Sequence, residues 1–298
     1  MTRNRSILKK LPIHYFIVEE CSIFCRMAER TLLLAHSCLR DTDFRVRASI
    51  AKGAGFNAIG LNAGSISNQY GEYQRLRTIG WTDETLHGVL LEFDIKIAEL
   101  EALVIGNDVQ ADEFVRLAQL FGVQTIQTIA WSTSNIKTDA LDFSHAVPWL
   151  RSVADRIVDL GCRIALEFIP TTPIPDADTA QRLADEVDRK NVGTCVDFWH
   201  VMRGRGISEM TRVDWTRVFN VQVNDGSLAP IDPDYIHDCL FNRVVPGDGE
   251  FPLDELVKFV PRSAPLNMEV MNSCLDGATS DDRQKILSRG LQRVLGAH

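Results

Sequence analysis

The feature that most constrains the fold is a repeat of short apolar segments separated by longer amphipathic stretches. Each apolar segment is about six residues long and rich in β-branched residues, which is typical of strands buried on both faces of a parallel sheet. Successive segments begin about 25 to 45 residues apart, which leaves room for a helical connection between parallel strands. The eight strands predicted in this way cover residues 31–36, 56–61, 94–99, 123–129, 162–167, 192–197, 219–224 and 266–270.

Helical patterns occupy the intervals between these strands. Residues 43–55 illustrate the signals, with the acidic Asp43 at the start and Gly53-Ala-Gly55 at the end. Strands that alternate with helices pair in parallel through right-handed crossovers, so the pattern predicts an α/β protein. The other predicted helices cover residues 83–92, 112–121, 141–160, 178–188 and 280–295.

Eight strand–helix units favour closure into a single (β/α)₈ TIM barrel, and a doubly wound open sheet is the alternative. The dinucleotide-binding sequence G-x-G-x-x-G does not follow the first strand, no Walker A sequence is present, and Gly204-Arg-Gly206 alone is a weak signal. The length of 298 residues suits a barrel, which typically needs about 250 residues. We therefore predict one barrel domain over residues 27–298.

Residues 1–26 do not follow the repeat. Pro12, Glu19 and Glu20 interrupt their apolar part, which argues against a secretory signal peptide. We expect an N-terminal extension outside the barrel, either disordered or not native, with Met27 as an alternative start of the chain.

Charge and cysteine content narrow the class of protein. The net charge of −8 argues against binding to nucleic acid or to an anionic membrane surface. No stretch approaches 18 uninterrupted apolar residues, so no membrane span is expected. The seven cysteines are scattered and odd in number, which favours a reducing cytoplasm over a disulfide framework. We expect a cytoplasmic protein that acts on a small molecule and is able to form a homo-oligomer.

Four consecutive predicted strands carry a polar side chain near the C-terminal end. In a barrel these side chains converge on the face where active sites lie. A single carboxylate there is usually a solvated cap or an ion pair, but three buried carboxylates without a cation would cost several kcal/mol each. The set predicts one divalent metal ion, with Mn²⁺ favoured, Mg²⁺ or Co²⁺ as alternatives, and Zn²⁺ less suited to oxygen-only ligands. Its predicted ligands are Glu167, Asp197, Gln222 and Glu269.

Other residues at the predicted strand ends are candidates for proton transfer and substrate binding. His200, three residues after Asp197, is the candidate general acid or base, with a structural histidine as the alternative. Arg243 could clamp a carboxylate or phosphate group, with Arg203 as a competitor and surface ion pairing as the alternative for both. The remaining candidates for the substrate pocket are His36, Asn62, Glu99, Glu101 and Trp131.

Several short motifs lie in the second half of the chain. They are Ala165-Leu-Glu-Phe168, Asp197-Phe-Trp-His200, Val221-Gln-Val-Asn-Asp225, Pro246-Gly-Asp-Gly249 and Met268-Glu-Val270. Together they resemble the xylose isomerase-like TIM-barrel superfamily, which holds sugar isomerases and epimerases, inositol-pathway enzymes, 3-dehydroshikimate dehydratases and endonuclease IV-type repair enzymes. The resemblance implies the four metal ligands named above, and a proton-shuttling role for Glu167 and Glu269 on opposite faces of the substrate.

One ligand departs from the pattern of the sugar epimerases. They usually have histidine where this chain has Gln222, and glutamine there is similar to the bacterial 3-dehydroshikimate dehydratases. The resemblance implies a metal-dependent isomerase or epimerase of sugars or polyol derivatives, with a dehydratase (a lyase) as the runner-up. A non-catalytic metal-binding barrel is the alternative from another class. Endonuclease-type repair is disfavoured because it needs more histidine ligands.

Overall fold

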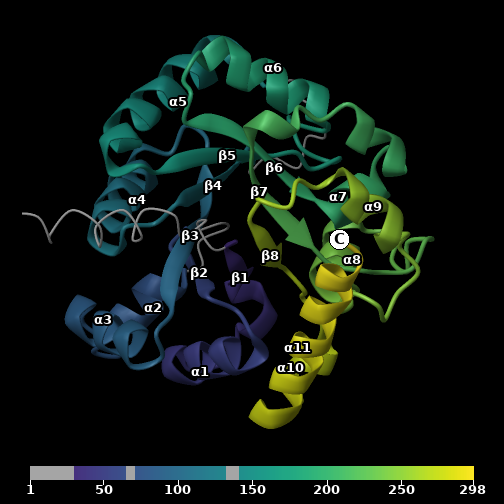
Figure 1. Ribbon diagram of the computed structural model, residues 1–298. Coiled ribbons are helices and arrows are strands. Elements are labelled where there is room, and N and C mark those ends of the chain that lie inside the picture. The colour runs from purple at the N-terminus through teal and green to yellow at the C-terminus, as the bar shows by residue number, and fades with distance from the viewer. Residues whose placement is uncertain (1–29, 65–70, 132–140) are drawn as a thin grey trace, which may run out of the picture. The chain divides into compact units, whose positions relative to one another are not determined.

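The computed structural model describes residues 30–64, 71–131 and 141–298, and the predicted N-terminal extension lies outside them. Residues Thr31–His298 form a compact unit built around a closed barrel of eight parallel strands (Figure 1). The predicted (β/α)₈ TIM barrel is therefore confirmed. Its strands are β1 (Leu32–Leu34), β2 (Ala58–Asn62), β3 (Lys96–Val104), β4 (Thr125–Ile129), β5 (Arg163–Glu167), β6 (Val192–Asp197), β7 (Val218–Val223) and β8 (Leu266–Met268).

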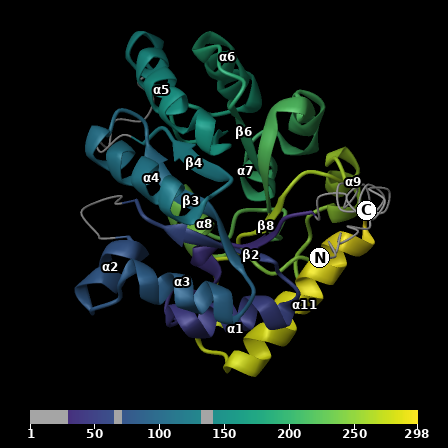
Figure 2. The same cartoon turned by 60° about the vertical axis from the view of Figure 1, so that its left-hand side comes forward.

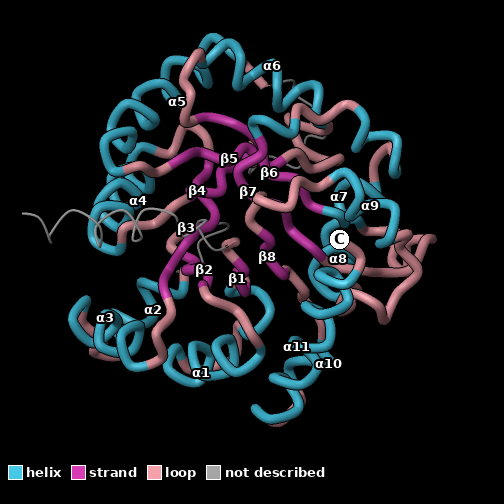
Figure 3. The backbone as a smooth tube through the Cα atoms, viewed as in Figure 1, coloured by secondary structure: helices cyan, strands magenta, loops and turns pink. Residues whose placement is uncertain are grey.

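The barrel closes where β1 pairs with β8, in parallel and with Leu33 opposite Asn267. Figure 3 shows the strands gathered inside a ring of helices. Parallel neighbours require a connection across the outside of the sheet, and the helices provide it. The C-terminal ends of all eight strands consequently meet on one face of the barrel.

The helices begin and end at residues whose chemistry explains the boundaries. Asp43, Asn107 and Asp176 each accept a hydrogen bond from a backbone N–H in the first turn of a helix. Gly55 ends α1 at a φ of 100°, a left-handed conformation that suits glycine. The helices are α1 (Phe44–Ala54), α2 (Glu72–Thr78), α3 (Asp83–Glu92), α4 (Asp108–Phe121), α5 (Phe143–Ile157), α6 (Ala177–Val187), α7 (Phe198–Arg203), α8 (Tyr235–Phe241), α9 (Leu253–Phe259), α10 (Ser273–Asp276) and α11 (Ser280–Gly296).

The last helix returns to the first. Helix α11 packs beside α1, as Figures 1 and 2 both show, so the C-terminal part of the chain covers the outside of the barrel near β1. The main apolar core fills the space between the strands and the helices. This packing keeps β1 and β8 together, where the barrel closes.

The barrel interior contains a polar layer. The Asn220 Nδ2 atom donates to Glu99 Oε1 at 2.5 Å, and Asn267 Nδ2 donates to Glu99 Oε2 at 2.6 Å. Glu99 is 1 % exposed, so burial raises the pKa of its carboxyl group well above the usual range, and Glu101 adds to the increase. Three strands are thereby joined inside the barrel by side-chain hydrogen bonds.

The sequence prediction missed the shorter helices. No helix was predicted between β2 and α3, but that segment contains α2, and α7, α8 and α9 were not predicted either. Each of the four has six or seven residues. Such a length spans about two turns, which is too short for a clear amphipathic period.

A pair of glycine substitutions tests the packing of β6. A Cβ atom at Gly193 would lie 2.1 Å from the Arg217 carbonyl oxygen, whereas nothing lies within 4 Å of a Cβ atom at Gly88 in α3. We expect Gly193→Ala to lower the free energy of unfolding by about 1–3 kcal/mol. We expect Gly88→Ala to raise it by about 0.5–1 kcal/mol. Urea denaturation measures both, and equal effects would contradict the described packing.

Candidate active site

A cavity of about 470 Å³ opens at the C-terminal ends of the strands, the face on which TIM-barrel active sites lie. Its walls come from almost every side of the barrel, and they are charged and polar near the strand ends. The residues that bring charge or hydrogen-bonding groups to the cavity include Glu101, Gln127, Glu167, His200, Arg243 and Glu269.

Asp197 ends β6 and begins α7. Its Oδ1 atom accepts hydrogen bonds from the backbone N–H of Trp199 and from Asn224 Nδ2, both at 2.7 Å. Burial raises the pKa of the Asp197 carboxyl group, but Arg243 and His200 oppose this effect, so the net pKa is lowered. The strand end and the helix cap together fix this carboxylate in its charged form.

His200 lies one turn into α7 and faces two carboxylates. Its Nε2 atom is 3.1 Å from Glu167 Oε1 and 3.7 Å from Asp197 Oδ2. Its Nδ1 atom lies 2.5 Å from the Tyr235 hydroxyl oxygen. One ligand atom from each of Glu167, Asp197 and His200 falls within 4.8 Å of the others, which is an arrangement able to hold a metal ion.

Arg243 brings one positive charge to the same centre. It is 1 % exposed, and its Nη1 atom donates to Asp197 Oδ2 at 2.8 Å and to Glu269 Oε2 at 3.0 Å. Its Nε atom donates to the Cys239 carbonyl oxygen at 3.1 Å, which holds the guanidinium in place. Arg243 therefore links the ends of β6 and β8.

Glu167 and Glu269 face the cavity from β5 and from the end of β8. Glu167 Oε2 accepts a hydrogen bond from Gln127 Nε2 at 2.5 Å. Within the described parts of the chain, the hydrogen bond that Glu269 Oε1 accepts is a long one, from Ser37 Oγ at 3.4 Å. Burial raises the pKa of Glu269 well above its usual range, Arg243 opposes the increase, and the charges of Asp197 and Glu167 add to it.

Gln222 lies opposite Asp197 in the pairing of β6 with β7 and is fully buried. Its Oε1 atom accepts a hydrogen bond from the Cys195 thiol at 3.3 Å, and Nε2 has no hydrogen-bond partner within the described ranges. Rotating the amide by 180° places Nε2 beside the sulfur and leaves the oxygen unpartnered. An unpartnered buried amide oxygen beside Asp197 is a suitable ligand atom for a hard cation.

The charge balance of the centre also fits a divalent cation. Glu167, Asp197 and Glu269 are three buried carboxylates, and Arg243 supplies one compensating charge to two of them. Two negative charges remain when all three are ionised, and a divalent ion would balance them. The residues present therefore fit the predicted metal.

Three of the predicted substrate-binding residues line the cavity on the side of β1, β2 and β4. They are His36, Asn62 and Trp131. Burial lowers the pKa of His36, and the nearby guanidinium groups of Arg47, Arg75 and Arg40 lower it further, so its ring is neutral.

Two candidates lie elsewhere. Glu99 is in the barrel interior, bound to two asparagines as described above. Arg203 has a side chain that is 3% exposed; its Nε atom donates to Asp238 Oδ2 at 2.9 Å and its guanidinium lies 4.1 Å from the Trp199 ring centroid. The structure does not bring these two side chains to the cavity with the others.

The sequence reasoning did not single out Gln127, Tyr235 or Cys239, which all line the cavity. The sequence does contain an indication of Gln127, because it is a long polar side chain in the middle of β4, a short strand whose residues are all buried. Tyr235 and Cys239 belong to α8, in the long connection between β7 and β8, where sequence periodicity carries no positional information.

A family model described as the xylose isomerase-like TIM barrel matches residues 50–288. The chain belongs to this family. The match covers β2 to β8 completely and extends from α1 into α11, so it includes all four predicted metal ligands. The family resemblance inferred from the strand-end motifs is thus confirmed. The comparison with curated protein sequences gives no match.

Solved structures of similar fold cover nearly the whole chain. The IolI protein, described with a bound zinc atom, is 18% identical, with a TM-score of 0.74 over 90% of this chain and 99% of that one. A probable 3-DHS dehydratase, AsbF of Bacillus anthracis, is 16% identical, with a TM-score of 0.67 over 89% and 98%. D-psicose 3-epimerase of Clostridium cellulolyticum H10 is 14% identical, with a TM-score of 0.67 over 90% and 99%. At these identities the likeness is one of fold.

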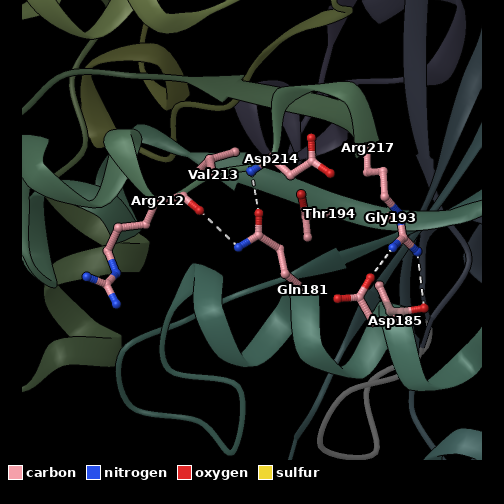
Figure 4. A pocket seen from close by; sticks show the side chains of 9 residues that line it. Gln181, Asp185, Gly193, Thr194, Arg212, Val213, Asp214 and Arg217 are labelled. Atoms are coloured by element: carbon pink, nitrogen blue, oxygen red, sulfur yellow. Dashed lines mark hydrogen bonds and ion pairs between the residues drawn. The ribbon is translucent and has the colours of Figure 1, made fainter.

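A second cavity, of about 310 Å³, lies near the start of β6 (Figure 4). Its polar side chains mainly bind one another or nearby backbone: Gln181 Nε2 donates to the Arg212 carbonyl oxygen at 3.0 Å, and Arg217 pairs with Asp185. The N-terminal face of a TIM barrel is associated with stability and not with catalysis. The first cavity is therefore the candidate active site.

Within the three described ranges, no helix has the length and apolar character needed to cross a membrane.

The metal prediction can be tested by direct binding. We expect Asp197→Asn to weaken Mn²⁺ binding by at least about 100-fold, because an amide replaces a charged ligand while the shape of the side chain is kept. Asp185→Asn, the same change in the second cavity, should leave the affinity unchanged. Isothermal titration calorimetry of both variants measures the difference. Equal Mn²⁺ affinity of Asp197→Asn and the unsubstituted protein would contradict the assignment.

Proposed function

We propose that the protein is a divalent-metal-dependent isomerase or epimerase of a sugar or polyol-derived substrate, acting by abstraction of a proton next to a carbonyl group. The observation that carries the proposal is the convergence of Glu167, Asp197 and His200, because Glu167 and His200 line the cavity together with Glu269. A divalent cation held by Glu167, Asp197, Gln222 and Glu269 would supply Lewis-acid stabilisation of the negative charge that develops on the substrate oxygens.

Glu269 is the proposed base. It lines the cavity, and among the described residues only Ser37, at the long distance of 3.4 Å, hydrogen-bonds to its Oε1 atom, so this oxygen can approach a substrate C–H group. Its other oxygen is held by Arg243. Because one oxygen is anchored and the other faces the cavity, Glu269 can take up and return a proton without moving its backbone.

Glu167 and His200 form a second proton-handling pair. Burial raises the pKa of Tyr235, so its hydroxyl keeps its proton and can donate to His200 Nδ1. When Nδ1 accepts this hydrogen bond, the proton of the imidazole lies on Nε2, at 3.1 Å from Glu167 Oε1. A proton can pass between these two atoms, and Glu167 can exchange it with the substrate.

The cavity walls supply orientation. Arg243 reaches the cavity from the loop after α8, and Trp131 and Ile129 provide apolar surface near the end of β4. A guanidinium beside an apolar wall favours a substrate that combines hydroxyl or carboxylate oxygens with a carbon skeleton. A small sugar, an inositol derivative or a cyclic hydroxy acid meets that description.

A metal-dependent dehydratase is the second candidate. Gln222 supports it, because the sequence of this chain has glutamine where the sugar epimerases of the family usually have histidine. The same proton abstraction followed by loss of a β-hydroxyl group would give a lyase. A barrel that binds metal without catalysis remains the candidate from another class. The presence of Glu167, His200 and Glu269, three groups able to exchange protons, in the cavity argues against it.

Solvent isotope exchange tests the function directly. We expect the Mn²⁺-loaded protein in D₂O to incorporate deuterium into one member of a panel of keto-sugars, inositol derivatives and 3-dehydroshikimate. Glu269→Gln should slow the exchange by about 10²- to 10⁴-fold, because the amide cannot accept the proton. Glu255→Gln, an exposed glutamate on α9, is the matched control and should exchange at the unsubstituted rate. Absence of exchange on the whole panel would overturn the proposal.

The metal dependence gives a separate prediction. Removing divalent ions with a chelator should abolish the exchange, and Mn²⁺, Mg²⁺ or Co²⁺ should restore it more fully than Zn²⁺, because the proposed ligands are oxygen atoms. Recovery is measured as the exchange rate at matched metal occupancy. Full exchange in chelator-treated protein would show that the reaction does not need the ion.

A further inference from the structure

We propose that the substrate carries an anionic group, a carboxylate or a phosphate, which Arg40 and Arg75 bind on the side of the cavity formed by β1 and β2. The inference rests on the proposed function and deepens it, because it names the charge class of the substrate. Both arginines line the active-site cavity, and His36 lines it with them.

These three residues come from two elements that follow neighbouring strands. His36 begins the short 3₁₀ helix η2 (His36–Leu39) after β1, and Arg40 comes directly after that helix. Arg75 lies in α2, after β2. The same three residues also line a third cavity, of about 380 Å³, whose other walls come from α2 and the start of α1. They therefore lie on the boundary between two cavities, with space beside them for a substituent of the substrate.

The remaining arginine of the active-site cavity is already occupied. Arg243 Nη1 donates to Asp197 and Glu269, as described above, and its Nε atom donates to the Cys239 carbonyl oxygen. Its Nη2 atom lies 3.1 Å from the Cys239 sulfur. Because its charge is balanced by two carboxylates, Arg243 has little to offer a further anion. That role falls to the other two guanidinium groups.

The groups around His36 leave this side of the cavity positively charged. Arg47 Nη2 donates to both carboxylate oxygens of Glu72, at 2.8 and 2.7 Å, so these two charges cancel. His36 itself is 8 % exposed, and its neutral ring has one N–H group that can donate to an anion. A buried donor beside two cations is a suitable arrangement for a carboxylate or a phosphate.

Two carboxyl groups of the protein oppose an added anion only in part. Asp276 Oδ2 lies 3.3 Å from Arg40 Nη2, with both side chains about one third exposed, so solvent screens this pair. A guanidinium has several donors and can bind a second anion at the same time. Glu101 lines the cavity, but burial raises its pKa to about 7 against the effect of Arg47, so it is only partly ionised at neutral pH.

The position of the arginines suits a small molecule that also reaches the proposed base. Ser37, next to His36 in η2, donates to Glu269 Oε1 at 3.4 Å. The anion subsite and Glu269 therefore belong to adjacent walls of one cavity of about 470 Å³. A substrate whose reacting carbon lies beside Glu269 can place a charged substituent at the arginines. Hydroxy acids and phosphorylated sugars have such a substituent, and neutral sugars and inositol do not.

Binding of matched ligands tests the subsite. Two pairs of probes are titrated into the Mn²⁺-loaded protein by isothermal titration calorimetry: quinate with myo-inositol, and D-fructose 6-phosphate with D-fructose. Only the first member of each pair is charged. We expect one charged probe to bind at least about 30-fold more tightly than its neutral counterpart, because its hydrogen bonds are charge-assisted. The pair that shows the preference distinguishes a carboxylate from a phosphate.

Substitutions identify the side chains responsible. Arg40→Gln and Arg75→Gln should each reduce the preference for the charged probe by about tenfold, with the Mn²⁺ affinity unchanged. Arg75→Lys keeps the charge but loses the planar fork, so it should retain part of the preference. Arg45→Gln is the matched control, because it removes an exposed guanidinium that pairs with Glu92 outside the cavity. It should bind all four probes as the unsubstituted protein does.

The outcomes separate this inference from the proposed function. Charged probes that bind no more tightly than their neutral counterparts would overturn the anion subsite, and so would a preference that survives both glutamine substitutions. Deuterium exchange on a neutral keto-sugar at a rate unaffected by Arg75→Gln would also overturn it, while the proposed function would stand. The expected preference without exchange on any member of the panel would retain the subsite and overturn the proposed function.

Discussion

The contact between Arg243 and the carboxylates of Asp197 and Glu269 is the interaction on which the candidate site depends. A guanidinium that is 1 % exposed bridges the ends of β6 and β8, with N–O distances of 2.8 and 3.0 Å. Removing one partner of a buried ion pair costs about 3–5 kcal/mol, because it leaves a buried charge without compensation. The guanidinium therefore stabilises the two carboxylates close together near the cavity.

Closure of the barrel is what assembles that contact. Asp197 and Glu269 are far apart in the sequence, and no local motif could place their side chains within reach of one guanidinium. The parallel pairing of β6 with β7 and of β7 with β8 aligns the strand ends, and the pairing of β1 with β8 closes the ring. The polar layer of Glu99, Asn220 and Asn267 ties β3, β7 and β8 together inside the same barrel.

The strands could be predicted from the sequence because each is a short apolar segment between helical patterns. A polar side chain at the end of such a segment can also be recognised without knowledge of the tertiary structure. It could not predict which interior positions face the cavity. Glu99 and Glu101 share one strand, yet one is bound in the interior and the other lines the cavity, and a one-residue bulge accompanies that difference. Tyr235 lies in a short helix of a long connection, and only the folded chain shows that it meets His200.

The double use of Asp197 restricts what can stand at that position. One carboxylate oxygen caps α7 and receives the Asn224 amide, which leaves only the other oxygen to face Arg243, His200 and a metal ion. A longer side chain would move the second oxygen away from its partners or give up the helix cap, since caps favour short side chains. The start of a helix and the proposed coordination of an ion would thus select the same amino acid for independent reasons.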